Sequence, residues 1–424
     1  MKTNGIFLGL VSLLWSFSAI TAQNICEVPP CEPVCETAPC DPCNPCDPCG
    51  ISVKNSNLFG LTVGGWVEAG IYTNSISSPT NGPMHSAGKE RRDFNMTQLY
   101  FFAEKELDTE HGFDWGARID LVYGTDTGSM QSFEDQSFDY DWGNNRHGYG
   151  MSAYQLYGTL GYKDLSVKYG KFITPVGWEE SAAKNNFFYS HSYCYWIEPA
   201  THTGVLGTYK ISDNLTFNAG WTAGMDNGFA NKFDDSSILT GFTVALSEKA
   251  TVYYWINKGT QYNGWSHYDN DWRWGDEVDR KNEYFVQSIC LEYLPTDKFT
   301  YLMQYNLRNN NYVAAADGAK TRGSAYGINN HFLYKLSDQW KAGVRAEWLR
   351  DSSGGLISGG SGDYYEVTLG LNWNPVENVS IRPEIRYDWC NGNNDQKPFG
   401  LDPITEQPFA REQVSGGCGI FVSF

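Results

Sequence analysis

The sequence predicts an all-β protein, a transmembrane antiparallel up-and-down β-barrel of about sixteen strands. Two observations predict this fold: long stretches in which apolar and polar residues alternate, and connections that are alternately short and long. Aromatic residues make up 15% of the chain, yet the mean hydropathy is only −0.45. That value excludes an ordinary helical membrane protein, whereas a barrel presents only alternate residues to lipid.

The alternation is clearest at 113–123, 215–221, 340–348 and 379–389, where every second residue is aromatic or aliphatic and most of the others are polar, charged or glycine. Tryptophan and tyrosine recur at both ends of the apolar face, which is typical of the aromatic girdles of membrane barrels. A soluble β-sandwich or propeller would also alternate. However, soluble strands average about 5–6 residues, and these stretches are longer.

The predicted connections fall into two classes. Short turns are expected near 108–110, 163–164, 212–214, 247–249, 295–298, 337–339 and 374–378. Long connections are expected near 75–93, 125–150, 173–201, 226–236, 259–281, 309–323, 351–361 and 390–413. This arrangement implies about sixteen strands with both chain ends on the short-turn side. The final alternation, ending at Phe424, resembles the signal by which outer-membrane barrels are recognised for insertion.

The chain divides into three predicted parts. Residues 1–22 have the positive start at Lys2 and the apolar run of a signal peptide. Residues 23–57 are rich in cysteine, proline and acidic residues, which predicts an extended periplasmic linker. Residues 58–424 form the predicted barrel. The expected location is therefore the bacterial outer membrane, with the linker in the periplasm.

Seven of the 11 cysteines lie in the linker. They are Cys26, Cys31, Cys35, Cys40, Cys43, Cys46 and Cys49. The spacing of the last four is also seen in zinc sites, but the separated pairs of a zinc fold and a nearby histidine are missing, so no metal is assigned. Export permits disulfides, and the odd number favours a bond to another chain or a free thiol. Disulfide-linked envelope partners are therefore one expectation.

The charged face of the strands is assigned to a wet lumen, because a dry interior would make such charges costly. The predicted lumen wall consists of Glu68, Arg118, Asp120, Lys168, Arg308, Lys341, Glu347, Glu366, Glu384 and Asp388. Together with Arg345, Arg382 and Arg386 their signs nearly balance, and the acidic connection 125–150 predicts a mild preference for cations. The net charge of −18 argues against nucleic-acid partners.

The segment 173–199 is the third long connection and mixes aromatic residues with carboxylates. In loop order and charge placement it is similar to the inward-folded third loop of general porins. We therefore expect it to fold into the lumen and form a pore constriction from Glu179, Glu180, Glu198, Arg345, Arg382 and Arg386. Two alternatives stay open: these charges are solvated separately, or the segment is an extracellular flap packed on a neighbouring protomer.

A family resemblance rests on the same stretch, Y-G-K-F-I-T-P-V-G-W-E-E followed by N-N-F-F-Y-S-H-S-Y. It resembles the signature of the OmpL-like β-barrel porins. The matching residues are Gly170, Lys171, Phe172, Pro175, Gly177, Glu179, Phe188, Ser190 and Ser192. The resemblance implies passive uptake of solutes, with outer-membrane lipid and small polar solutes and ions as partners and no cofactor. A homotrimer is one option for assembly. The Cys-Pro linker is not part of this pattern.

Two other functions remain as alternatives. One is a structural envelope protein that the linker crosslinks and the barrel anchors. The other is an outer-membrane lipid hydrolase that uses His191 with Ser190 or Ser192, although adjacent His and Ser rarely place a base on its nucleophile. A calcium site in the acidic connection is a further option, with Asp126, Glu134, Asp135, Asp139 and Asp141 as its carboxylates. Conductance separates pore from anchor, and a lipid-hydrolysis assay separates the enzyme.

The linker generates the first testable prediction, that its cysteines form disulfides in the envelope, some of them between chains. Envelopes run on non-reducing gels should show higher-mass species that collapse on reduction. Identical migration with and without reductant, with all seven linker thiols open to alkylation before reduction, would contradict the prediction.

Overall fold

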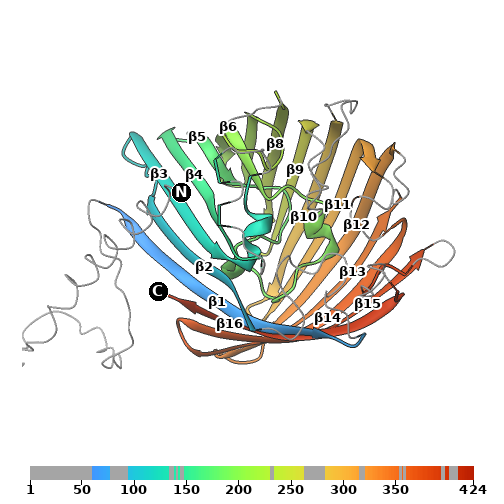
Figure 1. Cartoon of the computed structure of the whole chain (residues 1–424). Coiled ribbons are helices and arrows are strands. Elements are labelled where there is room, and N and C mark those ends of the chain that lie inside the picture. The colour runs from blue at the N-terminus through green and yellow to red at the C-terminus, as the bar shows by residue number, and fades with distance from the viewer. Residues whose placement is uncertain are drawn as a thin grey trace, which may run out of the picture. The chain divides into compact units, whose positions relative to one another are not determined.

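The structure is a computed structural model. It describes residues 60–76, 94–132, 138–139, 142–143, 148–229, 234–261, 282–314, 320–352, 356, 360–392, 397–400 and 409–424. The predicted signal peptide, the linker and its seven cysteines lie outside these residues. The described strands form one closed antiparallel barrel, in which each strand pairs with its sequence neighbours and β1 pairs with β16 (Figure 1). No helix in the described residues is long and apolar enough to cross a membrane.

The sixteen strands confirm the predicted fold class. They are β1 (Thr62–Asn74), β2 (Phe94–Lys105), β3 (Phe113–Gly124), β4 (Gly150–Tyr162), β5 (Leu165–Ile173), β6 (Thr201–Ser212), β7 (Leu215–Thr222), β8 (Ser237–Ser247), β9 (Ala250–Gln261), β10 (Asn282–Thr296), β11 (Phe299–Ala314), β12 (Lys320–Lys335), β13 (Trp340–Asp351), β14 (Gly362–Val376), β15 (Val379–Gly392) and β16 (Glu412–Ser423). Within the described residues, three short helical segments accompany them: η1 (Thr125–Ser129), η2 (Ala183–Asn185) and α2 (Tyr193–Trp196).

The barrel closes between its first and last strands. Trp66 pairs with Ser423, and the register continues to Asn74 opposite Ser415. The last residue takes part, because Gly65 exchanges two backbone hydrogen bonds of 2.9 Å with Phe424. A closed sheet leaves no unpaired strand edge, which is the condition for spanning a membrane with strands.

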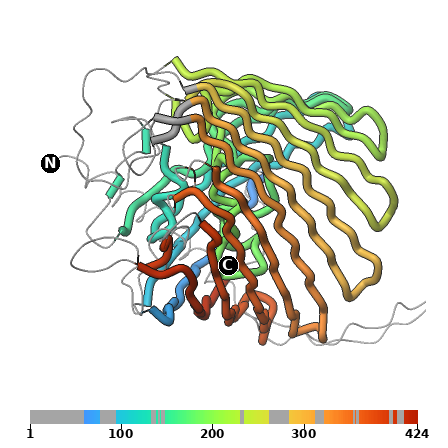
Figure 2. Tube along the Cα trace, turned by 90° about the vertical axis from the view of Figure 1, so that its right-hand side faces the viewer, coloured from blue at the N-terminus to red at the C-terminus, as the bar shows by residue number. Residues whose placement is uncertain are grey.

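The short turns lie where the sequence predicts them, and Figure 2 shows several of them as tight reversals of the yellow and orange strands at one end of the barrel. One predicted long connection, 309–323, is wrong. β11 continues to Ala314 and β12 begins at Lys320, with Val313 opposite Thr321. The run of three asparagines from Asn309 reads as a loop by composition, but pairing with the neighbouring strand keeps it in the sheet.

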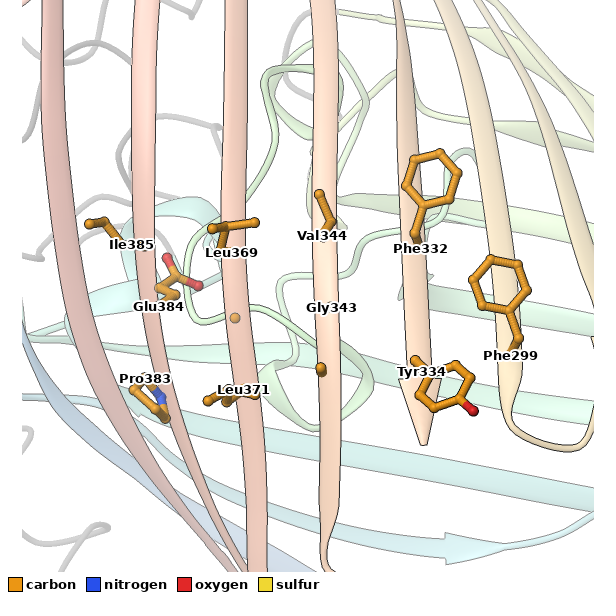
Figure 3. A pocket seen from close by; sticks show the side chains of 12 residues that line it. Phe299, Phe332, Tyr334, Gly343, Val344, Leu369, Leu371, Pro383, Glu384 and Ile385 are labelled. Carbon is orange, nitrogen blue, oxygen red and sulfur yellow. The ribbon is translucent and has the colours of Figure 1, made fainter. Parts of the chain in front are cut away.

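The outward face is apolar, as a lipid-facing surface requires. Phe332, Val344, Leu369 and Ile385 pair in register across four strands and stand side by side (Figure 3). They border a shallow hollow of about 610 Å³. Stacked aromatic pairs mark the two ends of this face. Trp340 and Trp373 lie near the short turns with ring centroids 5.5 Å apart, and Tyr365 and Trp389 lie near the long connections with centroids 5.1 Å apart.

This outward face generates the second prediction. Leu369→Arg should lower the free energy of unfolding by about 2–4 kcal/mol, because it places a charge in the apolar band. Ser166→Arg is the matched control, since Ser166 is half-buried and shares the inward face of β5 with Lys168. Urea unfolding in lipid vesicles, followed by tryptophan fluorescence, measures the free energy of unfolding of both variants. Equal destabilisation by the two variants would contradict the assignment of faces.

Candidate functional site

The candidate site is the segment 174–200, which joins β5 to β6 and lies inside the barrel (green in Figure 1). Only the three residues of η2 and the four of α2 are helical, so most of its peptide groups have no partner within the segment. Backbone N–H and C=O groups away from water need hydrogen-bond partners. The inward side chains of the barrel wall supply them.

Carboxylates of the wall accept from the amides of this segment. Glu384 of β15 accepts from the amide nitrogens of residues 189–190, at 2.8 and 3.2 Å for the nearest oxygens. Glu347 of β13 accepts from those of residues 193–194, both at 2.6 Å. At the other wall the Gln98 side chain of β2 accepts from the Ala183 amide nitrogen at 3.1 Å and donates to the Ser181 carbonyl at 2.6 Å. The segment is thus fixed by strands that follow and precede it in the chain.

Three arginines predicted for the constriction, Arg345, Arg382 and Arg386, donate hydrogen bonds to backbone carbonyls of the segment. All three are buried. The bonds run from Arg382 to Ala183 and Asn186 (3.0 Å each), from Arg345 to Ser190 (2.7 Å) and from Arg386 to His191 (2.6 Å). A guanidinium has five donors, so each arginine can bind the segment and still pair with a carboxylate.

The carboxylate partners of two arginines form a continuous network. Glu179 lies 2.8 Å from Arg345, which lies 2.5 Å from Glu366. Arg386 lies 3.5 Å from Glu366 and 2.7 Å from Asp388. All five side chains are buried. Removing one member of such a network leaves an uncompensated charge, which is far costlier than losing an exposed pair.

The pKa values of two carboxyl groups in the segment are shifted in opposite directions. Burial acts to raise the pKa of Glu179, but the nearby positive charge, above all that of Arg345, outweighs it and lowers the pKa to about 2. Burial raises the pKa of Glu198 well above its usual range, and the hydrogen bond from Asn306 offsets only part of that rise. Glu179 is therefore held as a charged partner, whereas Glu198 favours its protonated form.

The six residues predicted to form one constriction are divided among four places. Glu179 contacts Arg345 directly rather than across water. Glu180 accepts from Asn185 at 2.6 Å, and its charged neighbours are Arg118 and Asp120 on the opposite wall. Successive residues of an extended chain point to opposite sides, which separates the adjacent glutamates.

The remaining two members also have other partners. Glu198 accepts hydrogen bonds from Gln304 and Asn306 of β11 and forms no ion pair with an arginine of the part of the chain that the structure describes. Arg382 forms an ion pair with Glu68 of β1. Glu198 thus lies on the β11 wall, away from Arg382 and the arginines of the network.

The rest of the predicted lumen wall lies on the inward face of the strands. Arg118 pairs with Asp120 at 2.8 Å. The Lys168 ammonium lies 4.5 Å from the ring centroid of Tyr157. Arg308 is buried, with Nε 3.1 Å from Asn310. Lys341 is exposed to a cavity within the lumen.

Glycines of the wall make room for an aromatic triplet of the segment, Phe187 to Tyr189. A Cβ built on Gly370 would lie 2.9 Å from the ring of Phe188, and one on Gly343 would meet Phe187. A Cβ on Gly419 would lie 2.5 Å from the ring of Tyr189. These contacts were not predicted from the sequence. The signal that could have found them is the occurrence of glycine at inward positions of β13, β14 and β16.

The residues of the sequence motif lie where the segment meets the wall. Lys171, at the end of β5, forms a buried pair with Asp139 at 3.1 Å. Ser192 donates to Glu179 through both its amide and its hydroxyl, at 2.8 and 2.7 Å. Gly177 has φ +97°, a conformation that favours glycine, and its Cα lies against Glu198, where a Cβ would clash. The motif thus encodes how the segment docks.

Several residues predicted for the lipid hydrolase and for the calcium site have other partners in the structure. The Ser190 hydroxyl accepts from Arg345 at 3.1 Å, and the Ser192 hydroxyl donates to Glu179 at 2.7 Å. Asp126 accepts from Gln98, and Asp139 pairs with Lys171. Glu134, Asp135 and Asp141 lie outside the described residues.

The network generates the third prediction. Glu179→Gln should loosen the segment, because Arg345 then loses a buried charged partner, a change that costs about 3–5 kcal/mol in such settings. Amide hydrogen exchange of residues 181–194 should accelerate at least about tenfold. Glu180→Gln is the control and should leave exchange there unchanged, because Glu180 is only half-buried and pairs with an amide. Equal effects of the two variants would contradict the role given to the network.

Several solved structures have a similar fold. Salmonella typhi OmpF in complex with daunomycin has a TM-score of 0.55 at 11% identity, covering 86% of this chain and 97% of that one. Vibrio cholerae OmpT in its trimer form has a TM-score of 0.53 at 11% identity, covering 86% of this chain and 99% of that one. The anion-selective porin of Comamonas acidovorans has a TM-score of 0.53 at 9% identity, covering 86% of this chain and 99% of that one.

At these identities the likeness concerns the fold alone. A search of curated protein sequences finds no match. A family model, "Putative beta-barrel porin-2, OmpL-like", matches residues 60–424. This match covers most of the chain and includes the segment docked in the lumen. The chain therefore belongs to the OmpL-like β-barrel porin family, the family that its sequence motif resembles.

Proposed function

We propose that this protein is an outer-membrane porin that passes small hydrophilic solutes and ions by passive diffusion and catalyses no reaction. The observation that carries the proposal is the contrast between the two faces of one closed barrel. The outward face is apolar, and the inward face carries Arg, Lys, Glu and Asp from β1, β3, β5, β11 and β13–β15. Such a lining stabilises water and polar solutes where lipid surrounds the outside.

The segment 174–200 narrows this channel in the proposed mechanism. It contacts β2 on one side through Gln98, and β11, β13 and β15 on the other through Asn306, Glu347 and Glu384. A segment fixed on both sides leaves little free cross-section. We therefore expect a small single-channel conductance for the unaltered protein, with solute size limited at the level of η2 and α2.

The parts outside the described residues complete the proposal. Residues 1–22 direct export and are removed, and residues 23–57 extend into the periplasm as a linker whose cysteines bond to envelope partners. Vibrio cholerae OmpT, a protein of similar fold, is recorded as a trimer. A homotrimer is the assembly we propose for this chain as well.

One observation favours a second candidate, a structural protein anchored by its barrel. The segment is held by so many wall contacts that the lumen could serve as a plugged anchor for a crosslinked linker. Both candidates use the same linker chemistry. Conductance decides between them, because a plugged anchor passes no current.

The fourth prediction tests the narrowing. Deleting 178–190 should raise single-channel conductance severalfold, because it removes the part of the segment that binds Arg345, Arg382 and Glu384. Planar-bilayer recordings measure conductance, and heat-dependent gel mobility checks that the barrel has folded. Unchanged conductance in a folded deletion variant would reject narrowing by this segment.

A milder variant avoids a large deletion. Gly343→Ala with Gly370→Ala should displace Phe187 and Phe188, since overpacking costs about 1–3 kcal/mol, and should raise conductance or open-channel noise. Gly207→Ala is the control, because its Cβ would meet only the carbonyl oxygen of Ala219, at an ordinary 3.4 Å.

A further inference from the structure

A polar cavity of about 440 Å³ lies inside the barrel near the short turns. It is bounded by residues 184–187 of the docked segment, by the turns at 297–298 and 377–378, and by the adjoining residues of β11–β16. Liquid water occupies about 30 Å³ per molecule, so this volume accommodates a small ion with part of its hydration shell. The cavity is separate from the apolar hollow on the outward face (Figure 3).

Among the lysines that line this cavity, Lys335 pairs with Asp338 at 2.7 Å, whereas two inner lysines have no carboxylate partner among the described residues. Lys184 comes from the segment and Lys341 from β13, and neither forms an ion pair with any described residue. The carboxylates that line the cavity, Asp297 and Glu377, are exposed and belong to the turns at its rim, where Lys298 accompanies them. The inner part of the cavity is therefore positive, although the whole chain has a net charge of −18.

Arg382 holds this arrangement in place. It donates to the carbonyls of Ala183 and Asn186, at 3.0 Å each, and so fixes the backbone on both sides of Lys184. Arg382 also lines the cavity, and its buried Nε–H has no acceptor among the residues that the structure describes. An unmatched buried donor of this kind is costly and is satisfied by a ligand that supplies an acceptor.

We propose that this cavity is a binding subsite for compact oxyanions with two negative charges, such as hydrogen phosphate or a small dicarboxylate. The inference rests on the proposed porin function and names a class of solute for it. Two ammonium groups on facing elements form charge-assisted hydrogen bonds with oxygens of a divalent anion. The amide of Asn372 and the hydroxyl of Ser380 add neutral partners on the same wall.

The subsite would also shape the selectivity of the channel. The connection 125–150 at the opposite end is acidic and favours cations on electrostatic grounds. A cationic pocket near the short turns counters that preference for divalent oxyanions, because their attraction grows with charge while chloride gains less. The channel should thus favour cations over chloride and still retain divalent oxyanions.

Current block tests the proposal and gives the fifth prediction. With the full-length protein in planar bilayers at pH 8 and constant ionic strength, inorganic phosphate should reduce the chloride current. The half-blocking concentration should rise at least about tenfold in Lys184→Gln with Lys341→Gln, which removes both charge-assisted contacts. Lys168→Gln removes a lumen lysine of another wall and should leave block unchanged.

Succinate, applied in the same way, distinguishes the two sources of this chemistry. The anion with the lower half-blocking concentration identifies whether the cavity prefers phosphate or a dicarboxylate. Equal loss of block in Lys168→Gln would mean that total lumen charge is responsible, and this would overturn a local subsite.

Phosphorus NMR line broadening on the folded barrel in detergent provides a readout that does not need conduction. Broadening in the unaltered protein and in Lys168→Gln, but not in the double variant, supports the subsite. A barrel that conducts but shows neither block nor broadening rejects the subsite and leaves the porin function standing. A barrel that broadens the phosphate signal but passes no current rejects the porin function and leaves the subsite standing.

Discussion

The constraint on which the interior depends is the need of an irregular backbone for hydrogen-bond partners inside a barrel. A strand of the wall satisfies its peptide groups through its neighbours, but the segment 174–200 has no ladder to join. Side chains of the wall fill that role: carboxylates accept from amides, and arginines donate to carbonyls. The charges of the lumen therefore hold a polypeptide in place as well as lining a channel.

This double use explains why the network is so dense around β13–β15. Arg345 binds Glu179, Glu366 and the Ser190 carbonyl with one guanidinium. A lysine could not replace it, because three donors on a flexible stem do not match that fixed geometry. The apolar part of the docking uses shape instead, with Phe187 and Phe188 resting where Gly343 and Gly370 leave space.

Much of the fold was predictable because a strand that faces lipid on one side and water on the other has a strict period of two. The alternation around Trp340 to Trp348 fixed β13 without any knowledge of its neighbours. The same rule failed where polarity and secondary structure disagree. The polar stretch from Asn309 looks like a loop, yet pairing across β11 and β12 keeps it extended.

The site was less predictable, because its contacts join residues far apart in sequence. Loop order and charge suggested that Glu179 would meet an arginine of β13, but they could not separate Glu179 from Glu180 without the local backbone direction. Nor could composition predict that Glu198 would accept hydrogen bonds from Gln304 and Asn306. Those assignments depend on register between elements, which no local pattern records.

The docked segment also bears on the order of assembly. Its partners Glu347 and Glu384 follow it by 154 and 195 residues, and bringing such distant residues together is entropically costly and slow. When β5 and β6 have paired, the backbone groups of the segment still lack β13 and β15, so they must stay hydrated until the last quarter of the chain arrives. Final docking is then coupled to closure between β1 and β16, and the interior with its docked segment forms as a late, cooperative step rather than strand by strand.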